Sequence, residues 1–396
     1  MSLGLVLAVS CSFTSAAEED DSKFDMSKGG PTWSHGNNSL TLTMFTQARF
    51  LAEDKEQFDA DAAGTAGFGE EDGISTGFKL ARIRIGMKGT IFQPWVKYVL
   101  SYELSDTSGE RDAKFKDAYV EFAKAPLATV RFGQYKVPFS LQELCGDQNQ
   151  LFVERAVTTV FAPGREAGAA LGGRTKAKHF GYSVGAYNGA GESRSQDDKG
   201  LLYTARVFYE PFEEYKATES AQDAPEHHVL HFGAAYRIGE PGRGYDNLGV
   251  VQDINDQDAW NVEVGWKWRR WYATGEYFEQ STEVRNPTSG PDVKADGFHV
   301  QGSFMAIAKK LEFGVRYAVV DADSDAPDSE TEEIRGVVNY YWWGDNLKAT
   351  LDVGVVDYQP NAPGRNANGV TLDTGTRLVA GDVSDTVARF QLQFAF

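Results

Sequence analysis

The chain has 396 residues, a net charge of -18 and a mean hydropathy of -0.41, values that allow either two soluble domains or one large barrel. The acidic balance disfavours nucleic acid as a partner, because phosphate binding requires a basic surface. After residue 17 the sequence has no apolar run near the ~20 residues that a membrane-spanning helix requires, whereas 13% aromatic residues and 41 glycines suit many twisted strands.

The first residues, 1–17, have the pattern of an export signal peptide. An apolar stretch is followed by the small residues Ser15, Ala16 and Ala17 at a plausible cleavage site. Removal of this segment leaves Cys145 as the single cysteine, so no intramolecular disulfide can form. Residues 18–38 are polar and predict a mobile periplasmic tail.

Two-residue alternation of apolar and polar side chains begins near residue 39 and continues to the last residue. In 389–396, for example, Phe390, Leu392 and Phe394 share one face of a predicted strand, and Arg389 and Gln391 share the other. The polar face carries full charges on strand after strand, which is typical of a water-filled lumen and not of a soluble core. The alternation predicts strands near 39–50, 77–90, 94–105, 114–123, 128–136, 166–174, 180–189, 201–209, 229–237, 259–268, 271–280, 296–306, 311–321, 332–342, 347–358 and 385–396.

These strands predict an all-β fold, a transmembrane antiparallel β-barrel of about sixteen strands over residues 39–396. An even number is what a closed antiparallel barrel with both ends on one side requires. Connections after odd-numbered strands are mostly long and those after even-numbered strands mostly short, and the connection 210–228 departs from this rule. Aromatic clusters at 266–271 and 340–343, next to short turns, predict an interfacial girdle in contact with outer-membrane lipid.

Several segments resemble the phosphate-selective porin O and P family. The most specific is RFGQYKVPFSL at 131–141 followed by LFVERA at 151–156, with further matches at 163–168, 187–191 and 203–207. The terminal Phe396 is similar to the assembly signal of outer-membrane barrels. The resemblance implies a sixteen-stranded porin of the bacterial outer membrane, usually a homotrimer, whose third long loop folds inward. By order that loop is 137–165, and it would set a charged constriction.

The family's best-studied members select phosphate with lumenal arginines and lysines, and arginine suits this task because its planar fork donates two hydrogen bonds to a phosphate. Alternation assigns nine arginines to the lumenal face, and the implied inward loop adds three basic residues. The anion-track candidates are therefore Arg49, Arg82, Arg84, Arg131, Lys136, Arg155, Arg165, Arg174, Arg206, Arg316, Arg335 and Arg389.

Nearly as many acids share that face, which weakens the prediction of phosphate selectivity. The predicted lumenal acids are Glu103, Asp117, Glu121, Glu263, Glu276, Glu312, Glu333 and Asp352. Selectivity depends on the charges at the narrowest point, where the field is least screened. Two interpretations remain open: an anion-selective pore, and a general porin with opposing charges that passes small hydrophilic solutes or inorganic anions.

Other motifs do not predict chemistry, and the chain is expected to be neither an enzyme nor a cofactor protein. The G-x-S-x-G pattern at 181–185 lies in an alternating strand and not in a strand-to-helix turn. Residues 321–332 have EF-hand spacing but place Ala326 where glycine is needed, and His227, His228 and His231 form a chance cluster. The main alternative is a soluble secreted β-rich binding protein.

Overall fold

The computed structural model describes residues 22–26, 29–55, 74–105, 114–194, 200–239, 254–284, 292–359, 362, 365–366, 369–370 and 383–396. The predicted signal peptide lies outside the described residues. The strands are β1 (Ser22–Asp25), β2 (Thr32–His35), β3 (Asn38–Lys55), β4 (Ser75–Ile91), β5 (Gln93–Glu103), β6 (Lys114–Ala125), β7 (Ala128–Lys136), β8 (Arg165–Arg174), β9 (Phe180–Tyr187), β10 (Leu202–Tyr209), β11 (Val229–Gly239), β12 (Ile254–Trp268), β13 (Trp271–Val284), β14 (Val293–Ile307), β15 (Leu311–Asp321), β16 (Glu330–Tyr341), β17 (Leu347–Tyr358), β18 (Arg365–Asn366), β19 (Gly369–Val370) and β20 (Val383–Ala395). The helices are α1 (Leu141–Leu144), η2 (Asp147–Asn149) and η3 (Val157–Phe161).

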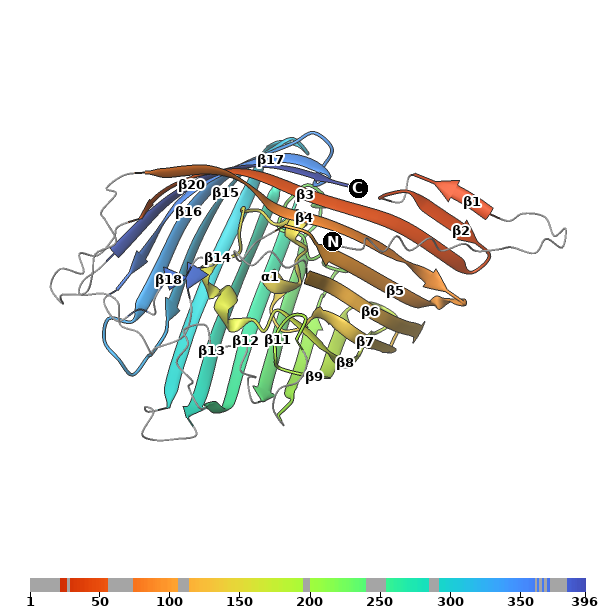
Figure 1. Ribbon diagram of the computed structural model, residues 1–396, viewed down its shortest axis with the longest axis horizontal. Helices are drawn as coiled ribbons and strands as arrows, with labels where there is room; N and C mark the ends of the chain where they lie inside the picture. The colour runs from red at the N-terminus through yellow and green to blue at the C-terminus, as the bar shows by residue number, and fades with distance from the viewer. Residues whose placement is uncertain are drawn as a thin grey trace, which may run out of the picture.

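Sixteen of these strands, β3 to β17 and β20, form a closed antiparallel barrel (Figure 1). Each strand pairs with its neighbours in the sequence, and β20 closes the barrel by pairing with both β17 and β3. In this closure Gln391 lies opposite Arg49. The predicted fold and strand number are confirmed, and the predicted bounds of β7, β15 and β17 agree with the structure.

The barrel has inverted polarity, with polar side chains buried inside and apolar side chains exposed outside. Along β15, Glu312 and Arg316 are buried, whereas Phe313 and Val315 between them are 47% and 69% exposed. Alternation produces this pattern because successive side chains of a strand point to opposite faces. An exposed apolar belt of this kind fits a lipid environment and contradicts the soluble alternative.

Tight turns join the strands at one rim of the barrel. Arg269 and Lys309 take positive φ angles of 54° and 58° in the turns after β12 and β14. The aromatic residues near these turns are outward and accessible, as Trp271 at 46% and Trp342 at 50% show. This position is the interface that the predicted aromatic girdle requires. Among the described residues, no helix is long and apolar enough to cross a membrane.

The segment predicted as a tail contains a hairpin that the prediction did not include. β1 and β2 pair with each other, and β2 pairs with the first residues of β3. Across the hairpin, Phe24 contacts Trp33 with 5.3 Å between ring centroids and planes inclined by 49°. The Thr32 hydroxyl also hydrogen-bonds with that of Thr41 at 2.8 Å and joins β2 to β3. Figure 1 shows it extending from the end of the barrel where the chain terminates.

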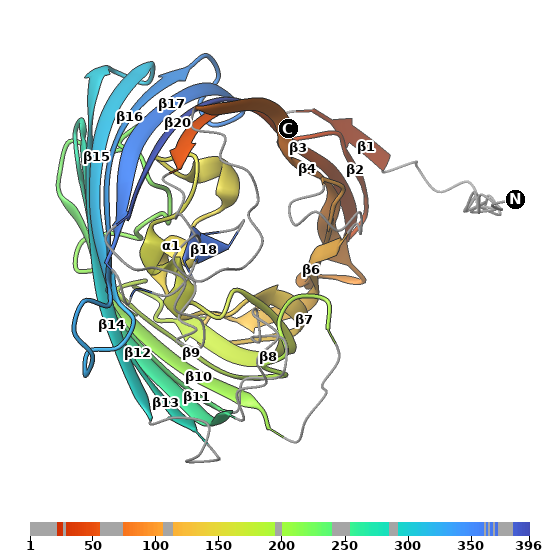
Figure 2. The same cartoon turned by 60° about the vertical axis from the view of Figure 1, so that its left-hand side comes forward.

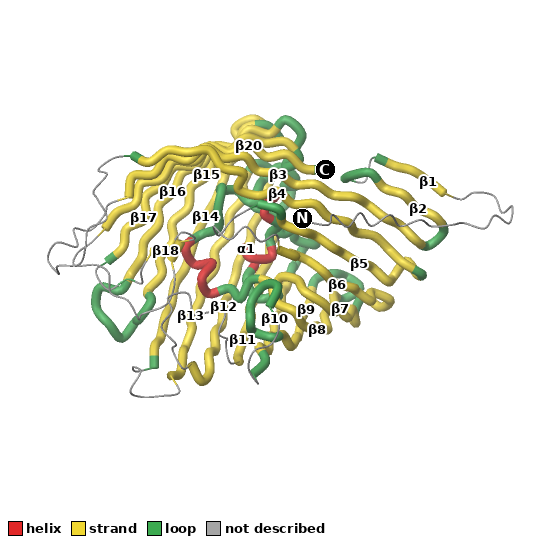
Figure 3. The backbone as a smooth tube through the Cα atoms, viewed as in Figure 1, coloured by secondary structure: helices red, strands yellow, loops and turns green. Residues whose placement is uncertain are grey.

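The helices are confined to the connection between β7 and β8 (Figure 3). Figure 2 shows this connection within the ring of strands. Its contacts determine how much of the lumen is open.

Candidate functional site

Residues 137–164, here named the first inward segment, run inside the barrel and are held by carboxylates of the wall. Backbone N–H groups donate to these carboxylates: Leu141 and Gln142 to Glu276, at 3.1 and 2.6 Å, and Val153 to Asp352 at 3.1 Å. The backbone donors of an irregular segment find no partner within the segment itself, and here the side-chain oxygens of wall acids accept them. The wall therefore supplies the hydrogen bonds that the segment lacks.

Apolar packing adds to this attachment. Phe161 of η3 stacks on Phe278 of β13, with ring centroids 5.4 Å apart and planes inclined by 9°. Phe139 contacts the same ring at 6.3 Å, and all three side chains are buried. This cluster continues along the inner faces of β11 to β15. The segment thus has an apolar core of its own on that side of the barrel.

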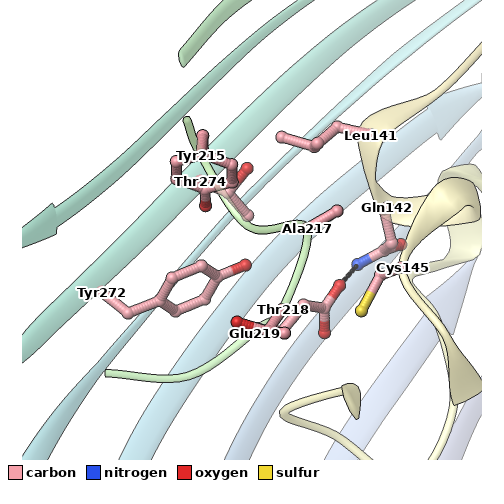
Figure 4. A pocket seen from close by; sticks show the side chains of 9 residues that line it. All are labelled: Leu141, Gln142, Cys145, Tyr215, Ala217, Thr218, Glu219, Tyr272 and Thr274. Carbon is pink, nitrogen blue, oxygen red and sulfur yellow. Dashed lines mark hydrogen bonds between the residues drawn. The ribbon is translucent and has the colours of Figure 1, made fainter. Parts of the chain in front are cut away.

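Residues 210–228, named the second inward segment, enter the barrel from the rim of short turns and meet the first. Glu219 accepts hydrogen bonds from Leu151 N at 3.0 Å and from the Gln142 amide at 3.1 Å. Figure 4 shows Gln142 and Glu219 facing each other beside Cys145, in a cavity of only about 10 Å³. Ser220 and Ala221 also donate to Glu312 on β15. Residues 210–228, which depart from the predicted alternation of long and short connections, are therefore part of the barrel interior.

The two inward segments together cover most of the predicted lumenal acids. Glu263, Glu276, Glu312, Glu333 and Asp352 are each at most 4% exposed. Four of them accept backbone N–H groups of the inward segments, since Val157 N also donates to Glu333 at 3.0 Å. All five acids face the interior as predicted, but they are buried and line neither open cavity, and four of them anchor the inward segments.

The predicted basic residues face the interior, and each has a carboxylate partner. The first group surrounds Asp147 and Glu154 of the first inward segment. Glu154 bridges Arg49 and Arg82, both at 2.7 Å. Asp147 contacts Arg84 and Arg155 at 2.9 Å, Arg82 at 3.9 Å and Lys136 at 4.0 Å. Arg165 pairs nearby with Asp117 at 3.1 Å.

This concentration of cations acts on the two carboxylates of the segment. Burial alone would raise the pKa of Asp147, but Arg155, Lys136, Arg84 and Arg82 together hold that pKa well below its usual value. The pKa of Glu154 is likewise lowered, against burial, by Arg82, Arg49 and Arg389. Both carboxylates are therefore ionised at neutral pH and lock the segment to the basic wall.

A second group of predicted residues forms buried pairs on the covered side. Arg335 lies between Glu333 at 2.7 Å and Asp352 at 3.2 Å, and Arg316 and Arg389 pair with these same two acids. Arg206 pairs with Glu263, which also accepts from His231. These arginines balance Glu263, Glu333 and Asp352 and are withdrawn from solvent.

Arg131 and Arg174 differ from the other ten predicted residues in their exposure. Their side chains are 34% and 32% exposed, whereas the others are exposed by 15% or less. Arg131 pairs with Glu121 at 2.6 Å and lies over the ring of Tyr119 at 4.5 Å. Of the twelve predicted residues, Arg131 and Arg174 therefore have the most accessible guanidinium groups.

Both groups line open space in the half of the barrel that the inward segments leave uncovered. One cavity, of about 590 Å³, contains Arg131, Arg174, Lys176 and Lys178. The adjoining cavity, of about 480 Å³, shares Arg131, Tyr135 and Leu144 with the first. Their charged side chains are eight basic and three acidic: Arg84, Lys88, Arg131, Lys136, Arg165, Arg174, Lys176 and Lys178 against Asp117, Glu121 and Asp147. Among the described residues, the lining of these two cavities is thus basic although the chain is acidic.

Sequence reasoning missed four of these residues. Lys88 has the same parity on its strand as Arg82 and Arg84, so the alternation could have placed it in the lumen. Lys176 and Lys178 belong to the turn after β8, and Asp147 to the first inward segment, where no periodicity assigns a direction. Their positions follow from tertiary contacts.

The remaining motifs are dispersed. Ser183 of the G-x-S-x-G pattern lies within β9. Asp321 and Ser329 of the EF-hand-like stretch hydrogen-bond each other, and among the described residues no group of three or more metal-ligating side chains could hold an ion. His228 stacks on Trp268, whereas His231 lies inside, between Glu210 and Glu263.

Comparison with known proteins agrees with this architecture. The family model described as phosphate-selective porin O and P matches residues 55–396. No curated protein matches the sequence significantly.

Among solved structures, the anion-selective porin from Comamonas acidovorans is 14% identical with a TM-score of 0.57, over 91% of this chain and 100% of that one. OmpF from Salmonella typhi, in complex with daunomycin, is 14% identical with a TM-score of 0.56, over 91% and 98%. The trimer form of OmpT from Vibrio cholerae is 12% identical with a TM-score of 0.54, over 89% and 99%. At these identities the likeness shows the fold alone.

Proposed function

The chain belongs to the phosphate-selective porin O and P family, and on that premise we propose that its lumen conducts small anions in preference to cations. It is an outer-membrane porin with a closed sixteen-stranded barrel. One observation carries the proposed anion preference: eight basic and three acidic side chains line the two open cavities.

The distribution of charge in the interior supports anion preference, although acids and bases are nearly balanced along the strands. A channel responds to the charges that its permeant ions approach, because low-dielectric walls focus the field into the open space. The lumenal acids of β12 to β17 are buried. Arginines pair with Glu263, Glu333 and Asp352, whereas Glu276 and Glu312 accept hydrogen bonds from neutral donors, so none of the five faces the open cavities. The acids of the open half, such as Glu121, are outnumbered by the bases around them. Anions are therefore favoured along this wall.

The proposal also includes passive conduction, a homotrimeric assembly and export by a signal peptide. We infer passive conduction without catalysis, which agrees with Ser183 lying in the middle of β9 and not on a strand-to-helix turn. A homotrimer is supported by the trimer form of the OmpT structure, to which this chain is similar. Export by residues 1–17, as a cleaved signal peptide, is supported by their sequence pattern.

The test is the reversal potential of the purified porin in planar bilayers under a KCl gradient. We expect the sign that corresponds to chloride permeation. The double variant Arg131→Gln/Arg174→Gln should move the potential toward zero. The matched control, Arg269→Gln/Arg270→Gln, removes the same charge at an exposed turn outside both cavities and should leave it unchanged. A cation-selective wild type, or equal shifts in the two variants, would contradict the proposal.

A further inference from the structure

The larger cavity offers more than positive charge, because its two accessible arginines have donors left for a ligand. Arg131 donates to Glu121 through Nε and Nη2, and among the described residues its Nη1 has no hydrogen-bond partner. Arg174 donates to Glu210 through Nη1, at 2.7 Å, which leaves its Nε and Nη2 likewise without an acceptor in the described part of the chain. Each guanidinium is about one-third exposed, so a carboxylate can reach these donors from the cavity.

Aromatic rings fix the orientation of both guanidinium groups. Arg131 lies over Tyr119 at 4.5 Å and over Tyr135 at 5.0 Å, and Arg174 lies over Phe208 at 4.6 Å. Stacking of this kind holds a guanidinium plane in place and leaves its edge to donate. The cavity therefore presents oriented donors beside apolar ring surface.

The wall between the two arginines is apolar and flat. Ala170 and Gly172 occupy inward positions of β8, and Leu144 and Pro138 of the first inward segment also line the space. In the register Arg131 lies opposite Ala170, and Arg174 follows four residues later, roughly 13 Å along the strand. Ala170 and Gly172 therefore lie between the two arginine positions along the wall and add apolar surface to the cavity.

We infer that this cavity binds organic carboxylates with an apolar body of about the size of an aromatic ring more tightly than inorganic anions such as phosphate. The inference rests on the proposed anion preference and adds the class of substrate. A hydrated phosphate gains only from the guanidinium donors. An organic carboxylate gains from the same donors and also removes apolar surface from water, both its own and that of Leu144, Ala170 and Phe208.

The volume supports a ligand of this size. At about 590 Å³ the cavity lies within the range of small-molecule sites, and a ring-sized carboxylate leaves space for water and chloride to pass. Binding must be weak for conduction to continue, since a solute that is held tightly blocks its own path. The expected behaviour is transient block of the chloride current.

The experiment measures block of the KCl current through the purified full chain by benzoate, acetate, inorganic phosphate and neutral benzyl alcohol. We expect half-block by benzoate at a concentration at least tenfold lower than by acetate or phosphate, and no block by benzyl alcohol. The double variant Arg131→Gln/Arg174→Gln should weaken block by benzoate and by acetate. Leu144→Gln removes apolar surface without changing charge, and should weaken block by benzoate alone, about threefold or more.

Each outcome has a defined meaning. Similar half-block by benzoate and acetate in the wild type, tighter block by phosphate, or block by benzyl alcohol would overturn the inference while a chloride-selective reversal potential still stands. A cation-selective reversal potential would instead overturn the proposed function. The wild-type series decides the inference even if Leu144→Gln fails to form the heat-modifiable barrel on SDS gels.

Discussion

Glu276 of β13 accepts the backbone N–H of Gln142 at 2.6 Å, which joins the barrel wall to the first inward segment by a hydrogen bond to a carboxylate. The same carboxylate accepts from Leu141 N at 3.1 Å and from the Asn261 amide at 3.0 Å. A lumenal acid is thus used as an anchor for irregular backbone. Because the acids of the covered half serve this purpose, the remaining open path is basic.

Glu276→Ala should loosen the first inward segment. The variant leaves two buried backbone N–H groups without their acceptor, and each unsatisfied group costs about 1–3 kcal/mol. We expect larger single-channel conductance and more open-channel noise, recorded in planar bilayers. The control is Glu332→Ala, because Glu332 precedes the anchoring residue Glu333 on β16 and lies on the opposite face of the strand. Unchanged conductance and noise in Glu276→Ala would show that the anchor is unnecessary.

Cys145 should report the same attachment by its reactivity. The thiol is 2% exposed, and burial, with Glu219 nearby, raises its pKa, so the reactive thiolate is scarce at neutral pH. In the mature chain after removal of residues 1–17, where Cys145 is the single cysteine, we expect negligible maleimide labelling of the folded barrel and complete labelling in denaturant, measured by mass spectrometry. Glu276→Ala should increase the labelling rate of the folded protein at least several-fold. Rapid labelling of the parent protein would contradict the buried position.

The ion pairs of Asp147 should show a defined dependence on pH. Its pKa in the folded chain is well below the unfolded value of about 4, so its stabilising contribution is complete above that value and is lost as pH falls toward the folded pKa. We expect the difference in Tm between the wild type and Asp147→Asn to be constant from pH 7 to 5, and to shrink below about pH 4. A difference that stays constant down to pH 2 would mean that the pKa is not lowered, and one that already shrinks between pH 7 and 5 would mean that it is raised.

The sequence predicted the wall well because alternation is a local property. Each strand must place polar side chains toward water and apolar ones toward lipid, so the lumenal position of Arg131 or Glu312 follows from parity. The hairpin of β1 and β2 was missed because four-residue strands carry little periodic signal, and its stability depends on the Phe24–Trp33 contact.

The position of a residue in the two-residue alternation of a strand does not show which lumenal side chains contact water. That distinction depends on contacts between residues far apart in the sequence, such as Asp352 with Val153 N and Glu312 with Ala221 N. Neither inward segment has a repeating pattern that would give its path. Lumenal charge counted from the sequence was therefore balanced, whereas the charge of the open space is basic.

The difference between covered and accessible lumenal positions predicts opposite phenotypes for Arg335 and Arg131, which both lie on the lumenal face of their strands. Arg335 is 5% exposed and lies between Glu333 and Asp352, so Arg335→Gln leaves two buried carboxylates with less compensation. Breaking a buried pair costs about 3–5 kcal/mol, and we expect a lower Tm with little change in reversal potential. Arg131→Gln, at an accessible position, should shift the reversal potential toward zero with a much smaller change in Tm.

Thermal unfolding monitored by heat-modifiable mobility and bilayer recordings under a KCl gradient measure the two effects on the same preparations. If Arg335→Gln moved the reversal potential as far as Arg131→Gln does, the covered half would be accessible to permeant ions. Ion selectivity would then reflect the whole lumenal wall, and the near-balance of acids and bases along the strands would decide it. Separation of the two phenotypes requires instead that the inward segments seal the acids away from the path, as the contacts of Glu276 and Asp352 indicate.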